Sequence, residues 1–178
     1  WKKMSEFDDE SGTLIQWSQL DRVGWKKGKT IFKHSEDLIG RMYRNWIHPD
    51  TDYPDASISL KIYNEETKKI SESWDFQPND PLYLMENTNV DLPEGIPDPM
   101  FEIAGEPVEK VYELETVDGE TTEEMVTLTF SICKPETRQR VNGNSAGSAS
   151  HGKHAKNNMG VSVVREGREL LLEQGWNS

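Results

Sequence analysis

Hydrophobic and polar positions alternate with two different periods along this chain. From Lys26 to Ile47, apolar residues return every three or four positions, which predicts a long amphipathic helix. Elsewhere apolar and polar residues alternate with period two, which is typical of strands with one buried face. The predicted strands are Thr13–Leu20, Ser57–Ile62, Ile70–Phe76, Val108–Thr116, Met125–Cys133, Val161–Arg165 and Glu169–Glu173.

Turn-forming residues indicate how the strands connect. Asn64–Thr67, Asp118-Gly119 and Glu166-Gly167 each lie between two predicted strands, so we expect three antiparallel hairpins. Between Pro78 and Pro99 there are five prolines, which predict a long surface loop, and the apolar residues 82–85 are expected to anchor it. We therefore predict an α+β fold, in which an antiparallel-rich sheet of about six or seven strands is backed by one long helix.

The length of 178 residues fits a single domain, which we place at residues 13–175. A polar, flexible linker is expected at 1–12 and a short tail at 176–178. Lys134–Arg140 is a candidate short helix. The glycine- and serine-rich segment at about 142–152 predicts a mobile loop.

Charge is distributed unevenly in this acidic chain, whose formal net charge is −12. Residues 1–133 carry 28 acidic and 13 basic residues, whereas residues 134–178 carry four acidic and seven basic residues. Because most of the surface repels a polyanion, we do not expect direct binding to nucleic acid. The basic residues between Lys134 and Arg168 instead suggest a small anionic target such as a phosphate.

The number of cysteines and the length of the apolar runs indicate where in the cell the protein is expected. Cys133 is the only cysteine, which excludes an internal disulfide, fits a reducing cytoplasm and is expected to be inert. No apolar run reaches the length of a membrane span. We therefore expect a cytoplasmic protein that does not enter a membrane.

The candidate chemistry gathers in the segment HGKHAKNNMG. Lys153 and Lys156, with His154 between them, could meet a phosphate group, although exposed lysines are more often simply solvated. His151 and His154 have no carboxylate or cysteine close in sequence, so we expect no metal site.

Other candidates for chemistry are weaker. Arg165 and Arg168 flank a turn and could bind phosphate, but residues of this kind more often lie at a hairpin end without binding anything. The chain contains no Gly-x-Ser-x-Gly and no His-Glu-x-x-His motif. We therefore expect no independent catalysis.

Three regions of the chain match a known pattern. These are SGTLIQWSQLDRV with the following HSEDLIGRMYRNWI, then FQPNDPLYLMENT, and finally HGKHAKNNMGVSVVREGREL. Together they resemble the transducer-like second domain that follows the nucleotide-binding domain in bacterial ATPases of the gyrase, heat-shock-chaperone, histidine-kinase and MutL type (GHKL).

This resemblance implies a fold and a site. The fold would be similar to a ribosomal-protein-like α+β domain with a left-handed β-α-β crossover. In the gyrase and MutL relatives a loop lysine of this domain reaches the γ-phosphate of ATP, and the position that matches here is Lys156 in His154-Ala155-Lys156. Lys153 is the alternative, because the match to the family's glutamine-threonine-lysine loop is limited to the lysine.

The resemblance also implies partners. ATP and Mg²⁺ would be bound by a preceding domain in cis, and the longer parent protein would be able to form a homodimer. This chain contains no Asp-x-Gly-x-Gly and no phosphate-loop lysine motif, so by itself it is expected neither to bind ATP tightly nor to hydrolyse it. The alternative function is an acidic protein-interaction module with no role in nucleotide binding.

Overall fold

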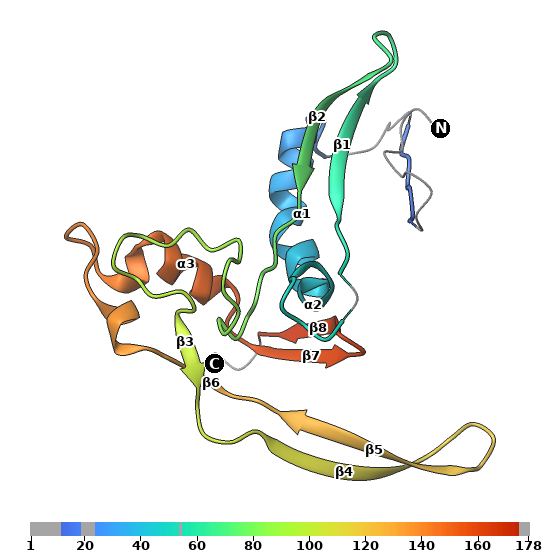
Figure 1. Cartoon of the computed structure of the whole chain (residues 1–178), viewed down its shortest axis with the longest axis vertical. Coiled ribbons are helices and arrows are strands. Elements are labelled where there is room, and N and C mark those ends of the chain that lie inside the picture. Colours follow the sequence, from blue (N-terminus) through green and yellow to red (C-terminus); the bar gives the residue numbers. More distant parts are fainter. Residues whose placement is uncertain (1–11, 19–23, 54, 175–178) are drawn as a thin grey trace. The chain divides into compact units, whose positions relative to one another are not determined.

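The structure is a computed structural model, and it describes residues 12–18, 24–53 and 55–174 (Figure 1). The described residues form two compact units. The first unit contains the described residues up to Asn79 and the segment Val164–Glu169. The second unit contains Asp80–Val163 and the described residues from Leu170 onward. The assignment of residues 13–175 to a single domain stays a prediction. The predicted linker, except for residue 12, and the predicted tail lie outside the described residues.

The predicted long helix is present in the first unit as two helices, α1 (Gly28–Met42) and α2 (Arg44–Ile47). The interruption falls at Tyr43, whose ψ of 14° departs from helical geometry. Gly40 lies inside α1. A Cβ atom there would lie 2.3 Å from the carbonyl oxygen of Gln77, so glycine allows the following chain to pack against the helix.

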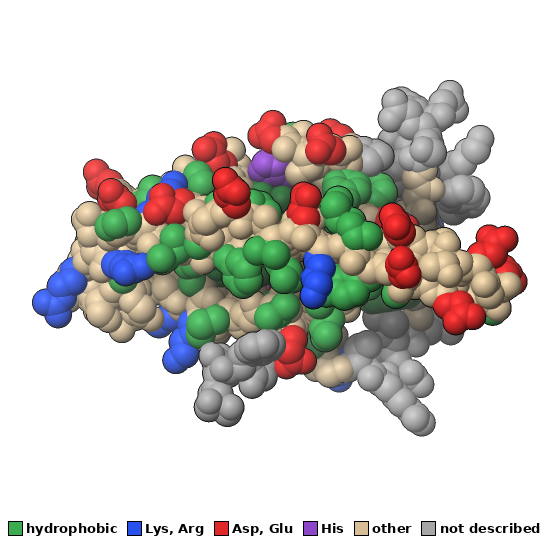
Figure 2. Space-filling model, turned by 90° about the horizontal axis from the view of Figure 1, so that it is seen from below, with side chains coloured by type: hydrophobic (Ala, Val, Ile, Leu, Met, Phe, Trp, Pro, Cys, Tyr) green, Lys and Arg blue, Asp and Glu red, His purple; other side chains and the backbone are tan. Residues whose placement is uncertain are grey.

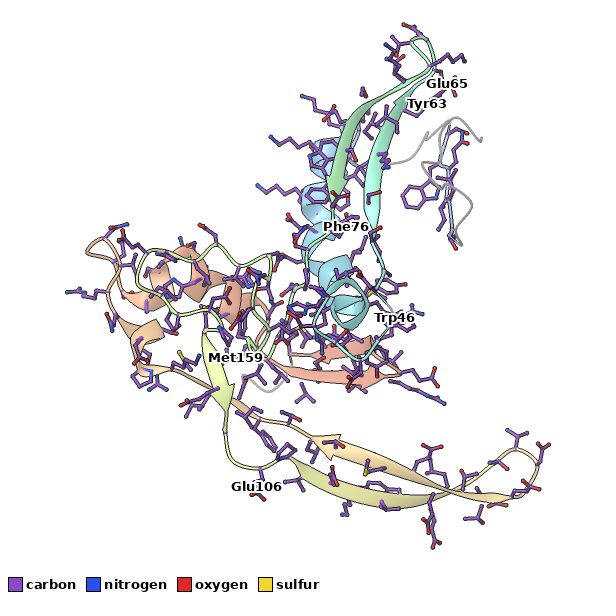
Figure 3. All side chains as sticks on the ribbon, viewed as in Figure 1. Trp46, Tyr63, Glu65, Phe76, Glu106 and Met159 are labelled. Atoms are coloured by element: carbon purple, nitrogen blue, oxygen red, sulfur yellow. The ribbon has the colours of Figure 1, made fainter. Side chains whose placement is uncertain are left out.

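The first predicted hairpin is confirmed as β1 (Ser59–Asn64) and β2 (Lys69–Asp75), which pair antiparallel with an irregularity between Ile62 and Tyr63. Helix α1 packs against it through Phe32, whose ring lies 5.7 Å from that of Trp74 and 4.9 Å from that of Phe76. Figure 3 labels Phe76 beside the helix. The core of this unit is therefore largely aromatic.

The predicted strand Thr13–Leu20 is not observed. Residues 12–18 contain no strand, and the side chains of Ile15 and Trp17 are exposed, while residues 19 and 20 lie outside the described part. The alternation of four apolar and polar residues was a weak signal, because a short strand needs a neighbouring strand to pair with.

The second unit contains a long hairpin built from four strands. β4 (Val108–Glu115) pairs with β5 (Thr121–Leu128), and β3 (Phe101–Ile103) pairs with β6 (Ser131–Cys133) on the same two chain segments. The predicted hairpin is confirmed, but its return strand is divided into β5 and β6, and β3 was not predicted. Gly105, at a φ of 81°, and the following Pro107 interrupt the outgoing strand, because proline has no N–H to donate.

The remainder of the second unit is mostly irregular. Residues 78–99 contain no helix or strand, as predicted. The predicted short helix at 134–140 is the 3₁₀ helix η1 (Pro135–Arg138), and it is followed by the 3₁₀ helix η2 (Ala146–Ser148) and by α3 (Ser150–Asn157). The segment 142–152, predicted as a mobile loop, therefore contains η2 and the start of α3. Gly152 permits this, since a Cβ atom there would lie 2.1 Å from the carbonyl oxygen of Ala146.

The last predicted hairpin is confirmed as β7 (Val161–Arg165) and β8 (Arg168–Glu173). Its turn residues Glu166 and Gly167 have φ values of 51° and 74°, the positive values that a tight two-residue hairpin turn requires.

The fold class is α+β with antiparallel sheets and few helices, as predicted. The prediction of one sheet backed by one long helix is wrong, because the described strands form four separate two-stranded sheets. Within the described ranges no helix connects two strands of the same sheet, so the left-handed β-α-β crossover is also not observed. Sequence periodicity identified most of the strands, but it carried no information on whether the hairpins pair with one another to form a single sheet.

Candidate functional site

Helix α3 has one buried and one exposed side. Its buried side is formed by His151, His154 and, just beyond the last turn, Asn158, at the spacing of three and four residues that places side chains on one helix face. Lys153 and Lys156 lie on the exposed side. The sequence pattern is unusual because the side that faces the protein is polar, so hydrogen bonds have to replace apolar packing there.

Tyr83 provides the main hydrogen bonds of this buried side. Its hydroxyl oxygen lies 2.9 Å from Nδ1 of His154 and accepts a hydrogen bond of 3.1 Å from the side-chain amide of Asn158. The hydroxyl can donate its proton to Nδ1 of His154, which the side-chain amide of Asn158 also approaches at 3.5 Å.

The loop holds Tyr83 in place through Asp80. The Asp80 carboxylate accepts hydrogen bonds from the backbone N–H groups of Leu82, Leu84 and Met85 at 3.0, 2.8 and 3.1 Å. These bonds bend the chain tightly, and Tyr83 adopts a φ of 54° that residues other than glycine rarely take. The predicted anchoring role of residues 82–85 is confirmed for Tyr83, which is buried. Its side chain anchors the loop by packing beside Phe101 and by bonding to α3.

His151 is the most deeply buried residue of α3, with 1% of its surface exposed. Its Nε2 lies 3.2 Å from the carbonyl oxygen of Thr137, and since a carbonyl only accepts, Nε2 carries the proton. Nδ1 makes no hydrogen bond to any described residue. The hydroxyl of Thr137 in turn donates to the carbonyl oxygen of Met100 at 2.9 Å. α3 is thus tied through η1 to the residue that precedes β3.

Lys153 and Lys156 lie almost one helical turn apart on the exposed side of α3. Neither ammonium group makes an ion pair or hydrogen bond with the described part of the chain. The helix therefore holds two cations near each other in solvent while its opposite side is fixed. This arrangement can bind an anionic group that comes from outside the second unit.

The structure separates the other basic residues that the sequence grouped with these lysines. The ammonium of Lys134 donates to the carbonyl oxygen of Pro99 at 2.7 Å, and Arg138 donates to the carbonyl oxygen of Cys133 at 3.1 Å. Arg165 and Arg168 belong to the first unit, where the Arg168 guanidinium lies 5.5 Å from the ring centre of Tyr43.

His154, the third residue predicted to bind phosphate, lies on the buried side of α3 rather than beside the lysines. Only Lys153 and Lys156 of the predicted residues share an exposed surface. The role of all three at a nucleotide stays a prediction.

A buried ion cluster in the first unit was not recognised in the sequence. Glu169, whose side chain is 2% exposed, accepts hydrogen bonds from Arg41 at 2.5 Å and from Arg44 at 3.1 Å. Nearby, the side-chain amide of Asn45 donates to the carbonyl oxygen of Gly167 at 3.0 Å. These contacts fasten the β7–β8 turn to α1 and α2. The only sequence signal was two arginines three apart in a helix, which is also the usual pattern of an exposed helix face.

Other possible sites are weak. A shallow, polar hollow of about 270 Å³ lies between residues 93–96 and 139–142. Among the residues that the structure describes, no three His, Cys, Asp or Glu side chains come together as they would around a metal ion. No described helix is both long and apolar enough to cross a lipid bilayer.

Comparison with known proteins adds no further constraint. No protein-family model, no curated protein and no solved structure matches this chain.

Proposed function

We propose that this chain is the transducer-like domain of a cytoplasmic GHKL-type ATP-binding protein. It couples ATP binding and hydrolysis in a preceding domain to the rest of the protein, and it supplies a lysine of α3 to the γ-phosphate. Lys156 is that lysine, with Lys153 as the alternative. ATP and Mg²⁺ are bound by the preceding domain, in a parent protein that can act as a homodimer, and the chain alone is not an ATPase.

One observation carries this proposal. Two ammonium groups without partners in the described residues stand on one side of a helix whose other side is fixed by buried hydrogen bonds. An ammonium held in advance at the place where charge develops stabilises that charge without reorganising at the moment of reaction. A lysine on an ordered helix is better suited to this task than one on a mobile loop.

The test is the ATP turnover of the protein that carries this chain together with its ATP-binding domain. Because one preorganised donor typically contributes a factor of about 10²–10³ to kcat, Lys156→Ala is expected to reduce turnover by about that factor. Lys153→Ala should change it by only about twofold to threefold, because the interaction of an exposed charge contributes about 0.5 kcal/mol. Lys110→Ala, which removes an exposed lysine from β4, is the matched control.

The outcomes separate the two lysines and the alternative function. A large loss with Lys153→Ala and none with Lys156→Ala transfers the role to Lys153. Unchanged turnover in both variants contradicts the nucleotide role and leaves the acidic interaction module, for which partner binding should be indifferent to nucleotide. A second readout is limited proteolysis, in which residues 142–157 become protected only when the ATP-binding domain and a nucleotide analogue are both present.

A further inference from the structure

The hairpin of β4 and β5 is exposed over its whole length. Its two strands pair over eight residues each without a register shift, from Val108 opposite Leu128 to Glu115 opposite Thr121. Every residue of both strands is exposed. In Figure 3 the side chains beyond the labelled Glu106 extend from both faces of this ribbon. A two-stranded hairpin uncovered on both faces is only marginally stable in water. The apolar residues of β4 and β5 therefore have a role other than packing in the core.

The register divides the hairpin into two different faces. Side chains alternate along a strand, and directly opposed residues share a face, so one face is mostly apolar. It carries Val108, Tyr112, Leu114, Val126 and Leu128, together with the charged residues Lys110 and Glu124. Between 44% and 52% of the surface of each of these apolar side chains is exposed. Figure 2 shows hydrophobic side chains gathered along the hairpin and acidic ones toward its tip. An apolar strip of this kind on a surface marks an interaction site.

The other face of the hairpin is acidic. It carries Glu109, Glu113, Glu115 and Glu123 around the apolar pair Val111 and Met125, and the register places Glu113 directly opposite Glu123. Two like charges at opposed positions destabilise a strand pair. A cation placed beside them would remove this repulsion, so the hairpin gains stability from a positively charged partner.

Net charge distinguishes between the possible occupants. Residues 106–128 contain eight acidic residues and a single basic one, Lys110. A second copy of this chain would bring the same excess of negative charge to the interface and be repelled. A partner with lysine or arginine side chains is attracted instead. Charge complementarity therefore favours a cationic occupant.

The outer edge of β4 is the part of the hairpin that best fits such a partner. Within the described residues β4 pairs only with β5, so the backbone N–H and C=O groups along its other edge have no strand to pair with. On β4 the mostly apolar face carries Val108, Tyr112 and Leu114 with one lysine, Lys110. The acidic face carries Glu109, Glu113 and Glu115 with one valine, Val111. An extended segment with alternating apolar and cationic residues would match both faces when added at this edge.

We propose that the outer edge of β4 binds an extended, cationic segment of a partner protein, which adds a third strand to the hairpin. Its apolar side chains lie beside Val108, Tyr112 and Leu114, and its lysine or arginine side chains lie beside Glu109, Glu113 and Glu115. This binding does not depend on the nucleotide role of α3.

The experiment uses the full chain and a fluorescein-labelled, end-capped peptide of alternating valine and lysine, with binding measured by fluorescence anisotropy. The control peptides are an alternating valine–glutamate peptide and a valine–lysine peptide of the same composition in blocks, which cannot place the two residue types on opposite faces of a strand. Binding of the alternating valine–lysine peptide should weaken as salt is raised, because charge contributes to it. Hydrogen exchange should show new protection of the β4 backbone when the peptide is bound.

Variants locate the binding site. Tyr112→Thr removes the central apolar side chain but keeps a residue suited to a strand. Glu109→Gln with Glu113→Gln removes two charges without changing side-chain shape. Each of these changes should weaken peptide binding by about tenfold, in line with the loss of one good interfacial contact. The matched control is Glu65→Gln with Glu66→Gln, which removes two charges from the β1–β2 turn. It should leave peptide binding unchanged.

Four results would overturn the proposal. These are equal binding of the valine–glutamate peptide, equal binding of the block peptide, protection of residues other than those of β4, and unchanged binding in both hairpin variants. Concentration-dependent self-association of the free chain that Tyr112→Thr abolishes would assign the surface to a second copy instead. Hydrogen exchange of the unbound variants shows whether β4 and β5 still pair. If Tyr112→Thr weakens this pairing, the variant with Glu109→Gln and Glu113→Gln still tests the proposal.

Discussion

Glu169 is the residue whose replacement should destabilise the first unit most clearly. Its carboxylate is the common partner of Arg41 and Arg44, at 2.5 and 3.1 Å, and its side chain is 2% exposed. Removing one member of a buried ion pair leaves the remaining charge buried without compensation, which typically costs about 3–5 kcal/mol. The Arg44 side chain is only 6% exposed and cannot turn to water without disrupting the packing around it, whereas that of Arg41 is 16% exposed.

The Glu169→Gln variant keeps the size of the side chain and one acceptor oxygen but removes the charge. We therefore expect a loss at the lower end of the range, about 3 kcal/mol in the free energy of unfolding. For a chain of this length each kcal/mol lowers Tm by about 2–4 °C, which gives a decrease of about 6–12 °C. Circular dichroism during thermal and urea unfolding measures both quantities.

The control for this prediction is Glu166→Gln, which removes the same charge from an exposed position in the turn of the same hairpin. It should change the free energy of unfolding by less than about 0.5 kcal/mol. If the two variants unfold at the same temperature, the buried cluster does not stabilise the fold and the reasoning fails. Replacing all three members with apolar residues of similar volume should be close to neutral, because the desolvation of the charges then disappears together with their attraction.

Two further predictions concern a buried hydroxyl and a carboxylate whose pKa is shifted. Tyr83→Phe removes the hydroxyl that bonds to α3 and should lower the free energy of unfolding by about 1–3 kcal/mol, whereas Tyr112→Phe at the exposed hairpin should have no effect in the same urea titration. Burial, assisted by the neighbouring charge of Asp37, raises the pKa of Glu36 above its ordinary value of 4.5. The folded state therefore loses stability as the pH rises from 4.5 through the raised pKa, so Glu36→Gln should stabilise the chain at pH 7 and have no effect below about pH 4. A stability difference that does not change with pH would contradict this assignment.

The candidate site could be predicted only in part. The sequence located the two lysines, because basic residues stand out in an acidic chain. It did not show that they lie on a helix, because a segment rich in glycine, serine and asparagine has low helix propensity. α3 forms because Tyr83 and Thr137, which are distant in sequence, accept or donate the hydrogen bonds that its buried polar side needs. Propensity alone carries no signal for contacts of that kind.

The sequence by itself determined the α+β class, the three hairpins and the main amphipathic helix. Those features depend on local periodicity and on turn residues such as Glu166-Gly167, and interactions between near neighbours in the chain are sufficient to specify them. Only the tertiary structure decided that the strands form separate pairs, that Glu169 is buried against Arg41 across 128 residues, and that the alternating β4–β5 strands are uncovered. The physical reason is that the alternation of apolar and polar residues shows which face of a strand is apolar. Whether another part of the protein covers that face depends on the three-dimensional arrangement.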